Sequence, residues 1–411
     1  WTVLDAAAAC ALLGVKRETL YAYAARGLVR SEPGPRGRAR RYVLEDLERL
    51  RARRDARSGH GPVAGAALRW GEPVLETRVG TIEPRGPVYR GALAVDLAAA
   101  GASFEAVAEL LWKGALPGAP PAWDHEPPRV DLDELARLVP RRSRPVDGLA
   151  LGIASIALRD DARFGAHDEA ELARARTLLL ELAAMLGLAR GASRVRAARK
   201  ADGVAARALV ALDGPKGDAP RAAVTRALVL LADHELNASS FAVRVAASTG
   251  ADLYACVGAG VSALTGPRHG GAIERVEAYM QGVQEPGDVA SVVGASMRRG
   301  EDVPGFGHAL YPDGDPRAGP LLEAATSLAP SAPRVRAIVA VAQAIARRGG
   351  PPPTVDVGLA ALVAALDLPA GSGAALFAIG RAAGWVAHAL EQRAAGFLLR
   401  PRARYVGQPA G

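Results

Sequence analysis

Apolar residues return every three or four positions through most of this chain, the spacing that places them on one face of an α-helix. Alanine, leucine, arginine and glutamate, which favour helices, dominate the same stretches. Residues 73–92 instead alternate β-branched and aromatic residues with Gly and Pro, which predicts a few short strands. We therefore expect a mostly helical fold. The clearest helical stretches are Phe104–Trp112, Ala170–Leu188, Ala222–Leu231 and Ala374–Leu390.

The composition is that of a globular protein. Of the 411 residues, 50% are hydrophobic and 23% are charged, which is typical of a chain with two or three domains. Cys10 and Cys256 are too few for a disulfide framework or a zinc site, so we expect a reducing cytoplasm and no metal. No run of about 18 uncharged apolar residues and no leader at residues 1–5 is found, so neither a membrane span nor secretion is expected.

The net charge of +8 is concentrated at the start of the chain. Residues 1–57 hold 13 Lys and Arg against seven Asp and Glu, whereas the other 354 residues hold 38 against 36. A small-residue stretch with the composition of a hinge, residues 58–62, follows at once. The sequence therefore predicts a separate basic domain at 1–57, and excess base of this kind fits a nucleic acid or another anionic partner.

Within the basic segment, two helical stretches surround a turn and a third follows a basic stretch. Leu4–Leu12 and Lys16–Ala25 lie on either side of Gly14, and Arg36–Arg41 precedes the helical stretch Glu45–Arg57. This order resembles the winged helix-turn-helix of MerR-like and excisionase-like DNA-binding domains.

In those domains the second helix enters the major groove and the wing contacts phosphates, which basic side chains neutralise. Two alternatives stay open, because a fold does not entail its function: the segment binds DNA as a dimer, or its basic face is only solvated and serves dimerisation. The resemblance implies base contacts from Arg17, Thr19 and Tyr23 and phosphate contacts from Arg38, Arg40 and Arg41.

Beyond the hinge, titratable residues gather in four segments that contain three of the seven histidines. Two of these histidines lie in Gly-rich turns, where backbone and ligand can approach closely. No His-x-x-x-His pair and no evident Ser or Cys nucleophile accompanies them, so the residues alone favour neither a metal site nor covalent catalysis. The segments are 233–239, 266–272, 304–317 and 354–356.

These segments resemble the citrate synthase family in their order and spacing, over about residues 68–408. The resemblance implies a two-domain, all-helical fold, with a large domain at 58–270 and 367–411 and a small domain at 271–366 that closes over it. The motifs are Asp233-His-Glu-x-Asn-Ala-Ser239, Gly266-Pro-x-His-Gly-Gly-Ala272, Pro304-Gly-Phe-Gly-His308, Asp315-Pro-Arg317, Val355-Asp356, Gly380-Arg-Ala-Ala-Gly-Trp385 and Arg400-Pro-Arg-Ala-Arg-Tyr405.

The resemblance also implies the role of each site residue. Asp356 matches the base that takes a methyl proton from acetyl-CoA, and its apolar neighbours would make it more basic. His269 matches the donor to the thioester oxygen, and His308 the group that polarises the oxaloacetate carbonyl. The dicarboxylate is held by His234, Arg317, Arg381 and, from the other subunit of a homodimer, Arg400. The CoA-binding loop is Pro304, Gly305, Phe306 and Gly307.

The chain departs from the family pattern at several places. Pro312–Gly314 stands where a CoA-binding cation is common, which leaves Arg298 or Arg299 as substitutes. Ile273 replaces a usual Asn, Arg268 replaces a usual apolar residue, and Val357–Ala360 implies a differently shaped pocket. The three catalytic positions are intact, so we expect activity with an acyl chain or keto acid still to be identified.

The resulting expectation is a cytoplasmic, homodimeric acyltransferase of the tricarboxylic acid cycle, fused to a helix-turn-helix domain. Its partners would be oxaloacetate and acetyl-CoA or a related acyl-CoA, with DNA as a further partner through residues 1–57. No cofactor is expected, because the CoA thioester is a substrate. Two alternatives remain: a 2-methylcitrate synthase that uses propionyl-CoA, and a transcription regulator whose body senses a tricarboxylate or acyl-CoA.

Overall fold

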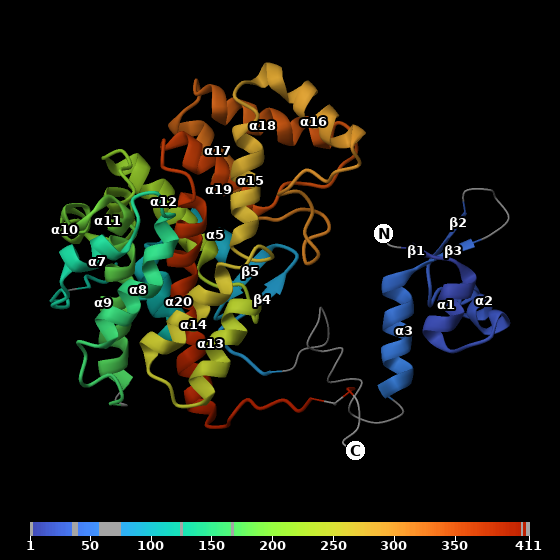
Figure 1. The fold of residues 1–411 in the computed structure, drawn as a ribbon, viewed down its shortest axis with the longest axis horizontal. Helices are drawn as coiled ribbons and strands as arrows, with labels where there is room; N and C mark the ends of the chain where they lie inside the picture. The colour runs from blue at the N-terminus through green and yellow to red at the C-terminus, as the bar shows by residue number, and fades with distance from the viewer. Residues whose placement is uncertain are drawn as a thin grey trace. The chain divides into compact units, whose positions relative to one another are not determined.

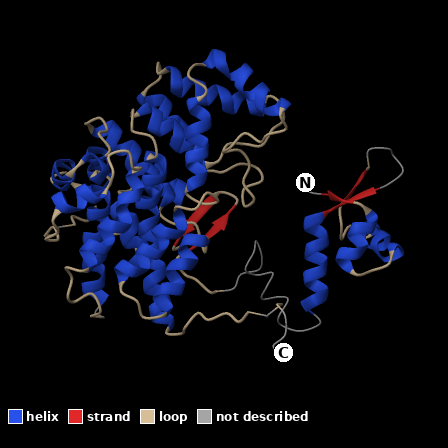
Figure 2. Cartoon of the chain, viewed as in Figure 1, coloured by secondary structure: helices blue, strands red, loops and turns tan. Residues whose placement is uncertain are grey.

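The structure is a computed structural model that describes residues 3–34, 40–56, 75–123, 126–165, 168–403 and 406–407. Helices dominate it, as predicted, and the strands are few and short (Figure 2). The chain divides into two compact units, Trp1–Thr77 and Arg78–Gly411, and each has its own apolar core. The predicted hinge at 58–62 lies outside the described residues.

The N-terminal unit consists of a three-stranded antiparallel sheet and three helices. The strands pair in the order β1-β3-β2. Leu4 was predicted to be helical, but it lies in a strand because the Asp5 side chain caps the first helix, accepting a hydrogen bond of 2.8 Å from the Ala8 N–H. The elements are β1 (Val3–Leu4), α1 (Ala6–Leu13), α2 (Arg17–Ala25), β2 (Ser31–Pro33), β3 (Arg40–Val43) and α3 (Leu44–Ala56).

A helix-turn-helix forms the centre of this unit. Helix α1 ends at Gly14, whose φ of +60° is the left-handed conformation that glycine adopts without strain, and α2 follows after two residues. Arg30 and Asp46 join the turn before β2 to α3 by side-chain bonds of 2.9 and 3.0 Å. The buried core is formed by Ala9, Leu13, Leu20, Val29, Tyr42 and Leu47.

The second unit is a helical body with one small sheet at its start (Figure 1). The sheet has the antiparallel order β4-β5-β6 and consists of β4 (Gly80–Glu83), β5 (Gly86–Tyr89) and β6 (Ala92–Leu93), within the segment predicted to hold strands. The helices up to the His234 turn are α5 (Ala94–Ala99), α6 (Phe104–Lys113), α7 (Leu132–Leu138), η1 (Pro145–Asp147), α8 (Gly148–Ala157), α9 (Asp168–Met185), η2 (Leu188–Arg190), α10 (Ala192–Arg199), α11 (Gly203–Ala211) and α12 (Asp218–Leu231). The later helices are α13 (Ala238–Ser248), α14 (Leu253–Leu264), α15 (Gly271–Gln281), η3 (Pro286–Asp288), α16 (Val289–Arg298), α17 (Ala318–Leu328), α18 (Pro333–Ala346), α19 (Val355–Ala365) and α20 (Ser372–Ala395).

Two clusters of buried apolar side chains lie in this body. The larger cluster includes Leu376 and Trp385 of α20, and the smaller one draws on α15, α16, α18 and α19. Helix α19 is shared between them, because Val357 belongs to the smaller cluster and Leu359 to the larger. The finer division into a large domain and a small domain at 271–366 stays a prediction.

Helix α20 is the longest described helix and lies in the core. Its length and apolarity alone would let it cross a bilayer, but 94% of that apolar stretch is buried inside the protein itself, as in the core helix of a globular protein. The sequence search missed this stretch because Arg381 interrupts it. It is the one such helix in the part of the chain that the structure describes.

Candidate active site

The candidate site residues of the body lie mainly at helix ends and in turns. His234 lies between α12 and α13, His269 directly precedes α15, and His308 lies between α16 and α17. Asp356 is the second residue of α19, whereas Arg381 lies in the middle of α20. Helix ends leave backbone groups without intrahelical partners, so they are places where side chains and ligands are bound.

The turn that carries His234 is held by the following helix. Asn237 caps α13 by accepting bonds of 3.0 and 3.2 Å from the Ser239 and Ser240 N–H groups. Glu235 has a φ of +54°, a conformation that costs free energy for a residue with a side chain, so the surrounding contacts must hold it. The position of His234 is therefore imposed by its neighbours.

A buried Asp–His pair also supports this turn. His388 Nε2 lies 3.1 Å from Asp233 Oδ1, and both side chains are fully enclosed. Asp233 Oδ2 accepts a further bond of 3.1 Å from the Glu235 N–H. A Cβ added at Gly80 would lie 2.7 Å from Asp233 Oδ2, and one at Gly384 would lie 2.5 Å from Oδ1. The second glycine of the 380–385 motif is thus required to admit this carboxylate.

Three rings form one wall of the site. His234 Nε2 lies 3.1 Å from the Tyr311 hydroxyl, and the ring centres of His234 and His308 are 5.7 Å apart. Burial, and then the charge of Arg317, lower the pKa of both histidines, so both are neutral at pH 7. His308 Nδ1 accepts a bond of 3.1 Å from the Leu310 N–H, which leaves its proton on Nε2 as a donor.

Arg317 is a buried cation with a fixed counter-charge. Its guanidinium donates bonds of 2.9 and 2.8 Å to the two oxygens of Asp315. Asp315 also accepts a bond of 3.0 Å from the Val355 N–H at the start of α19. Burial opposes the ionisation of Asp315, but the charge of Arg317 and the hydrogen bonds from Arg317 and the Val355 N–H together outweigh it and lower the pKa of the carboxyl. The pair joins the His308 loop to the helix that carries Asp356.

Arg381 is also buried but is incompletely paired. Its Nε donates a bond of 2.9 Å to the Leu231 carbonyl, its guanidinium lies 4.8 Å from the centre of the Phe377 ring, and its Nη2 has no partner among the described residues. Burial lowers the pKa of Arg381 to about 10, which leaves it charged at pH 7. A buried guanidinium with a free donor fits an anionic ligand.

His269 is held by a chain of side-chain hydrogen bonds. Its Nε2 lies 2.8 Å from Ser239 Oγ, which accepts a bond of 3.1 Å from Trp385 Nε1 and lies 2.7 Å from Asn237 Oδ1. Its ring centre is 5.8 Å from that of Phe377. Burial, and then the charge of Arg381, lower the pKa of His269 to about 4. The ring is therefore neutral at physiological pH.

Asp356 has the environment predicted from its apolar neighbours. Protein atoms crowd its carboxyl, and this burial raises the pKa to about 6, although the charge of Arg317 and a bond of 3.3 Å from the Thr354 hydroxyl act in the opposite direction. Thr354 also caps α19. A carboxylate with this pKa is ionised at pH 7 and is a better base than an ordinary Asp.

The loop 304–307 packs directly against the start of α19. The Thr354 N–H donates a bond of 2.8 Å to the Gly305 carbonyl, and the Gly307 N–H donates one of 2.9 Å to the Pro352 carbonyl. Gly305 has a φ of +89°, and a Cβ there would lie 2.7 Å from the Val357 side chain. The predicted CoA-binding loop therefore lies beside the predicted base.

The other predicted residues lie in the segment after α20 and in the N-terminal unit. Arg400 is exposed in the segment after α20, and no described contact joins it to the other site residues. In the N-terminal unit, Arg17, Arg40 and Arg41 are exposed, whereas Thr19 and Tyr23 are partly buried. Arg38 lies outside the described residues.

Sequence reasoning missed several residues that the structure brings to the site. Tyr311 contacts His234, which is 77 positions earlier in the chain. Trp385 donates a hydrogen bond to Ser239, 146 positions earlier, beside His269. Phe377 lies between His269 and Arg381. Asp315, Ser239 and Trp385 were inside recognised motifs and Tyr311 was inside the segment 304–317, but nothing in one sequence identifies the contacts of Tyr311 or Phe377.

Comparisons with known proteins match both units of the chain. Residues 67–402 match the family described as citrate synthase, C-terminal domain, and residues 6–61 match MerR HTH family regulatory protein. The putative citrate synthase 2 of Mycobacterium tuberculosis is 37% identical over 338 residues, 78% of this chain and 86% of that protein. The 2-methylcitrate synthase 2 of Corynebacterium glutamicum is 30% identical over 345 residues, 79% and 90% of the two proteins.

Solved structures show the same architecture. Citrate synthase of Thermoplasma acidophilum, in a ternary complex with carboxymethyl coenzyme A and oxaloacetate, aligns with a TM-score of 0.70 and 26% identity over 82% of this chain and 95% of that one. The fold and the matches define a condensing enzyme with transferase activity. The chain belongs to the citrate synthase family, and its N-terminal segment is a helix-turn-helix of the MerR type.

Proposed function

We propose that the protein condenses an acyl-CoA with a 2-oxo dicarboxylate, and that acetyl-CoA and oxaloacetate, which give citrate and free CoA, are its substrates. The observation that carries this proposal is the arrangement of two neutral histidines and a carboxylate with a pKa of about 6 in one body with a buried arginine that has a free donor. Each group has the protonation state that its proposed step requires.

In the proposed first half-reaction, Asp356 takes a proton from the methyl group of the thioester while His269 donates a hydrogen bond to the thioester oxygen. Ser239 has one proton and two acceptors, Asn237 Oδ1 and His269 Nε2. The Ser239 hydroxyl donates a bond of 2.7 Å to Asn237 Oδ1, and in the proposed step it turns its proton to His269 Nε2, 2.8 Å away. His269 then carries its own proton on Nδ1, where it can stabilise the developing enolate.

In the proposed second half-reaction, the enol carbon attacks the oxo carbon of the dicarboxylate. His308 polarises that carbonyl through Nε2–H and gives its proton to the alkoxide. His234, Arg317 and Arg381 hold the carboxylates, for which planar guanidinium groups are well suited. Water then hydrolyses the thioester and releases CoA.

Fewer residues bear on which acyl group is used and on how CoA is bound. Arg299 donates bonds of 2.7 and 2.6 Å to Glu301, whereas Arg298 is exposed at the end of α16, which favours Arg298 as the cation for the CoA phosphates. Relatives named citrate synthase and 2-methylcitrate synthase are both similar to the chain, so propionyl-CoA is the alternative acyl donor.

The test is the release of free thiol from acetyl-, propionyl- and butyryl-CoA in the presence of several keto acids. We expect the fastest release with acetyl-CoA and oxaloacetate and none from Asp356→Ala, with Asp161→Ala, an exposed carboxylate, as the matched control. Absence of thiol release with every substrate pair would refute the proposal. Fastest release with propionyl-CoA would identify a 2-methylcitrate synthase.

We also infer a homodimer in which Arg400 of one subunit completes the site of the other. Arg400 lies apart from the dicarboxylate residues of its own chain, which supports this arrangement. Mixing an Arg400→Ala protein with an Asp356→Ala protein tests it: hybrid dimers would regain one intact site, so the mixture should regain activity that neither variant has alone. No recovery in a mixture shown to exchange subunits would contradict the inference.

The second candidate function is transcription regulation through the N-terminal unit, with the body sensing a tricarboxylate or acyl-CoA. The match to MerR-type regulators and the exposed Arg17, Arg40 and Arg41 favour DNA binding. Salt-dependent retention of the full chain on DNA, weakened when these three arginines are replaced by Ala, would support it. Retention unchanged by these substitutions would favour a role in oligomerisation alone.

A cytoplasmic location, a place in the tricarboxylic acid cycle and the lack of a cofactor beyond CoA remain proposals of the same kind. Fractionation of cells that express the protein checks the first. Thiol release by the dialysed protein in the presence of a chelator checks the last, because an enzyme that needs only its two substrates keeps its rate.

A further inference from the structure

We infer that Glu277 is a positioning residue for the condensation: it fixes helix α15, which begins just after His269, against the N-terminus of α20, which carries Phe377 and Arg381. The inference rests on the proposed role of His269. Glu277 belongs to none of the motifs that define the site, and it lies two turns along α15 from His269.

The first observation is the pairing of the Glu277 carboxylate. One oxygen accepts a bond of 2.7 Å from the Gly371 N–H, and the other accepts one of 2.9 Å from the Gly373 N–H. Gly371 is the N-cap of α20 and Gly373 lies in its first turn, where a helix of 24 residues leaves donors without intrahelical partners and where its dipole favours negative charge. Gly371, the N-cap residue of α20, has no side chain that could cap the helix. Glu277, 94 positions earlier, caps it instead.

The second observation is that the backbone is built for this approach. A Cβ added at Gly373 would lie 2.5 Å from Glu277 Oε1 and 2.7 Å from the Ile273 side chain. Gly371 has a φ of +80°, which turns the chain into α20. Only glycine at 373 allows α15 and its carboxylate to come this close to α20.

The third observation is the contact at the other end of the same helix pair. His269, before the first turn of α15, meets Phe377, whose ring lies 5.8 Å away, and Phe377 lies one turn after Gly373 on the same face of α20. The two helices therefore touch at two points, Glu277 with Gly371 and Gly373, and His269 with Phe377. The Glu277 bonds therefore also help to set the position of His269 relative to Phe377.

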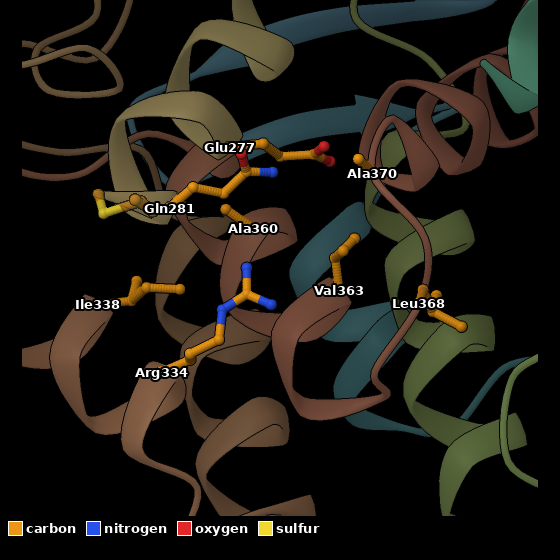
Figure 3. Close-up of a pocket in the computed structure, with 9 residues that line it drawn as sticks. Glu277, Gln281, Arg334, Ile338, Ala360, Val363, Leu368 and Ala370 are labelled. Carbon is orange, nitrogen blue, oxygen red and sulfur yellow. The ribbon is translucent and has the colours of Figure 1, made fainter. Parts of the chain in front are cut away.

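On the side away from its two hydrogen bonds, the Glu277 carboxyl borders a cavity. A cavity of about 60 Å³ lies beside it, lined also by Gln281, Arg334 and Leu368, and Figure 3 shows the carboxyl end of Glu277 directed across it toward Ala370. Burial raises the pKa of Glu277, while the charge of Arg334 and the two backbone bonds act in the opposite direction. The two bonds keep the carboxyl on the side of the cavity that faces α20.

A neighbouring ion pair offers a matched control. Glu274, one turn earlier on α15, pairs with Arg144 at 2.6 Å, and Arg144 also pairs with Asp147. These groups are partly exposed, so their ion pairs are worth little free energy. Glu274→Gln removes a charge from the same helix and leaves the bonds of Glu277 to the Gly371 and Gly373 N–H groups in place.

The experiment compares wild type with Glu277→Leu, Glu277→Gln and Glu274→Gln in the full chain. We expect Glu277→Leu to lower kcat about 10- to 100-fold, because a displacement of about 1 Å at a catalytic group has effects of this size. The KM for the dicarboxylate should stay within about twofold, Glu277→Gln should recover part of the rate because its amide oxygen still accepts, and Glu274→Gln should match wild type. Amide exchange at Gly371 and Gly373 should be slow in wild type and faster in Glu277→Leu.

Three results would overturn the inference. The first is an unchanged kcat in Glu277→Leu. The second is a loss of dicarboxylate binding in Glu277→Leu as large as its loss of kcat, which Glu277→Gln does not repair. The third is amide exchange at Gly371 and Gly373 that is equally fast in wild type and in Glu277→Leu. If the wild type itself released no thiol, the proposed function would fall. The contact would then still be judged by the exchange measurement, and equal exchange in the two proteins would reject it.

Discussion

The two units of this protein use charged side chains in opposite ways. In the N-terminal unit, Arg17, Arg40 and Arg41 reach into solvent, where a cation gains from any nearby anion and is screened by salt. In the body, Arg317 and Arg381 are 2% and 1% exposed, and their partners are fixed at specific atoms. The net charge therefore describes the first unit and says almost nothing about the second, where selectivity depends on the position of a few charges.

The largest expected effect is at Asp356, where surrounding protein atoms oppose the ionisation of a carboxylate. Asp356→Asn should lower kcat by about 10³-fold, within the range that general-base catalysis supplies. In wild type, kcat/KM should fall about tenfold per pH unit below pH 6, because the base must be ionised and its pKa is about 6. A pH profile that stays flat down to pH 4.5 would show that the enclosed carboxyl does not act as the base.

A smaller effect is expected from moving a buried cation without removing it. Arg381→Lys keeps the charge but loses the planar fork, so kcat/KM for the dicarboxylate should fall about 10²-fold, as expected when a buried charge loses its hydrogen bonds. Arg336, exposed on α18, is the control, and Arg336→Lys should have no effect. If both substitutions changed kcat/KM only slightly and equally, the buried Arg381 would be no more important for the dicarboxylate than an exposed arginine.

The enclosed carboxyl should also be visible in stability. Its folded pKa of about 6 lies above the ordinary value of 3.8, so the protonated form favours folding and this contribution is lost as pH rises through 6. Asp356→Asn should therefore raise the free energy of unfolding by about 3 kcal/mol at pH 8 and by only about 0.5 kcal/mol at pH 4. Thermal unfolding at the two pH values measures the difference, and an equal shift at both would show that burial of the charge is not its cause.

The smallest expected effect lies in the N-terminal unit. Replacing Arg40 and Arg41 by Ala should reduce the slope of log affinity for DNA against log salt by about two, one for each lost phosphate contact. Thiol release should stay within about twofold. A change in condensation rate from these exposed positions would mean that the two units do not act independently.

The helices of this fold were predictable because each depends on residues close in sequence. The apolar spacing in 374–390 predicts a helix there, and the structure has α20 at Ser372–Ala395. Leu4 was assigned wrongly because periodicity does not register that Asp5 stops the helix. His269 and His308 were found because glycines mark their turns, and the basicity of Asp356 followed from apolar neighbours.

Contacts between distant segments were beyond one sequence. Tyr311 meets His234 across 77 positions, and Glu277 meets Gly371 across 94. Neither residue has a local pattern that distinguishes it from any Tyr in a loop or any Glu on a helix, because its role comes from the packing of α15, α17 and α20. Only the folded chain reveals these partners.

Helix α20 has one further consequence, which concerns the lengths that related chains can have. Four side chains along this one helix contact different segments of the body: Phe377 contacts His269, Arg381 the Leu231 carbonyl, Trp385 Ser239, and His388 Asp233. Each residue added to or removed from an α-helix turns everything beyond it by 100° and shifts it by 1.5 Å. A one-residue insertion at Phe377 would thus misplace all three later side chains at once, so this helix can vary in composition but not in length, and insertions must fall in the loops.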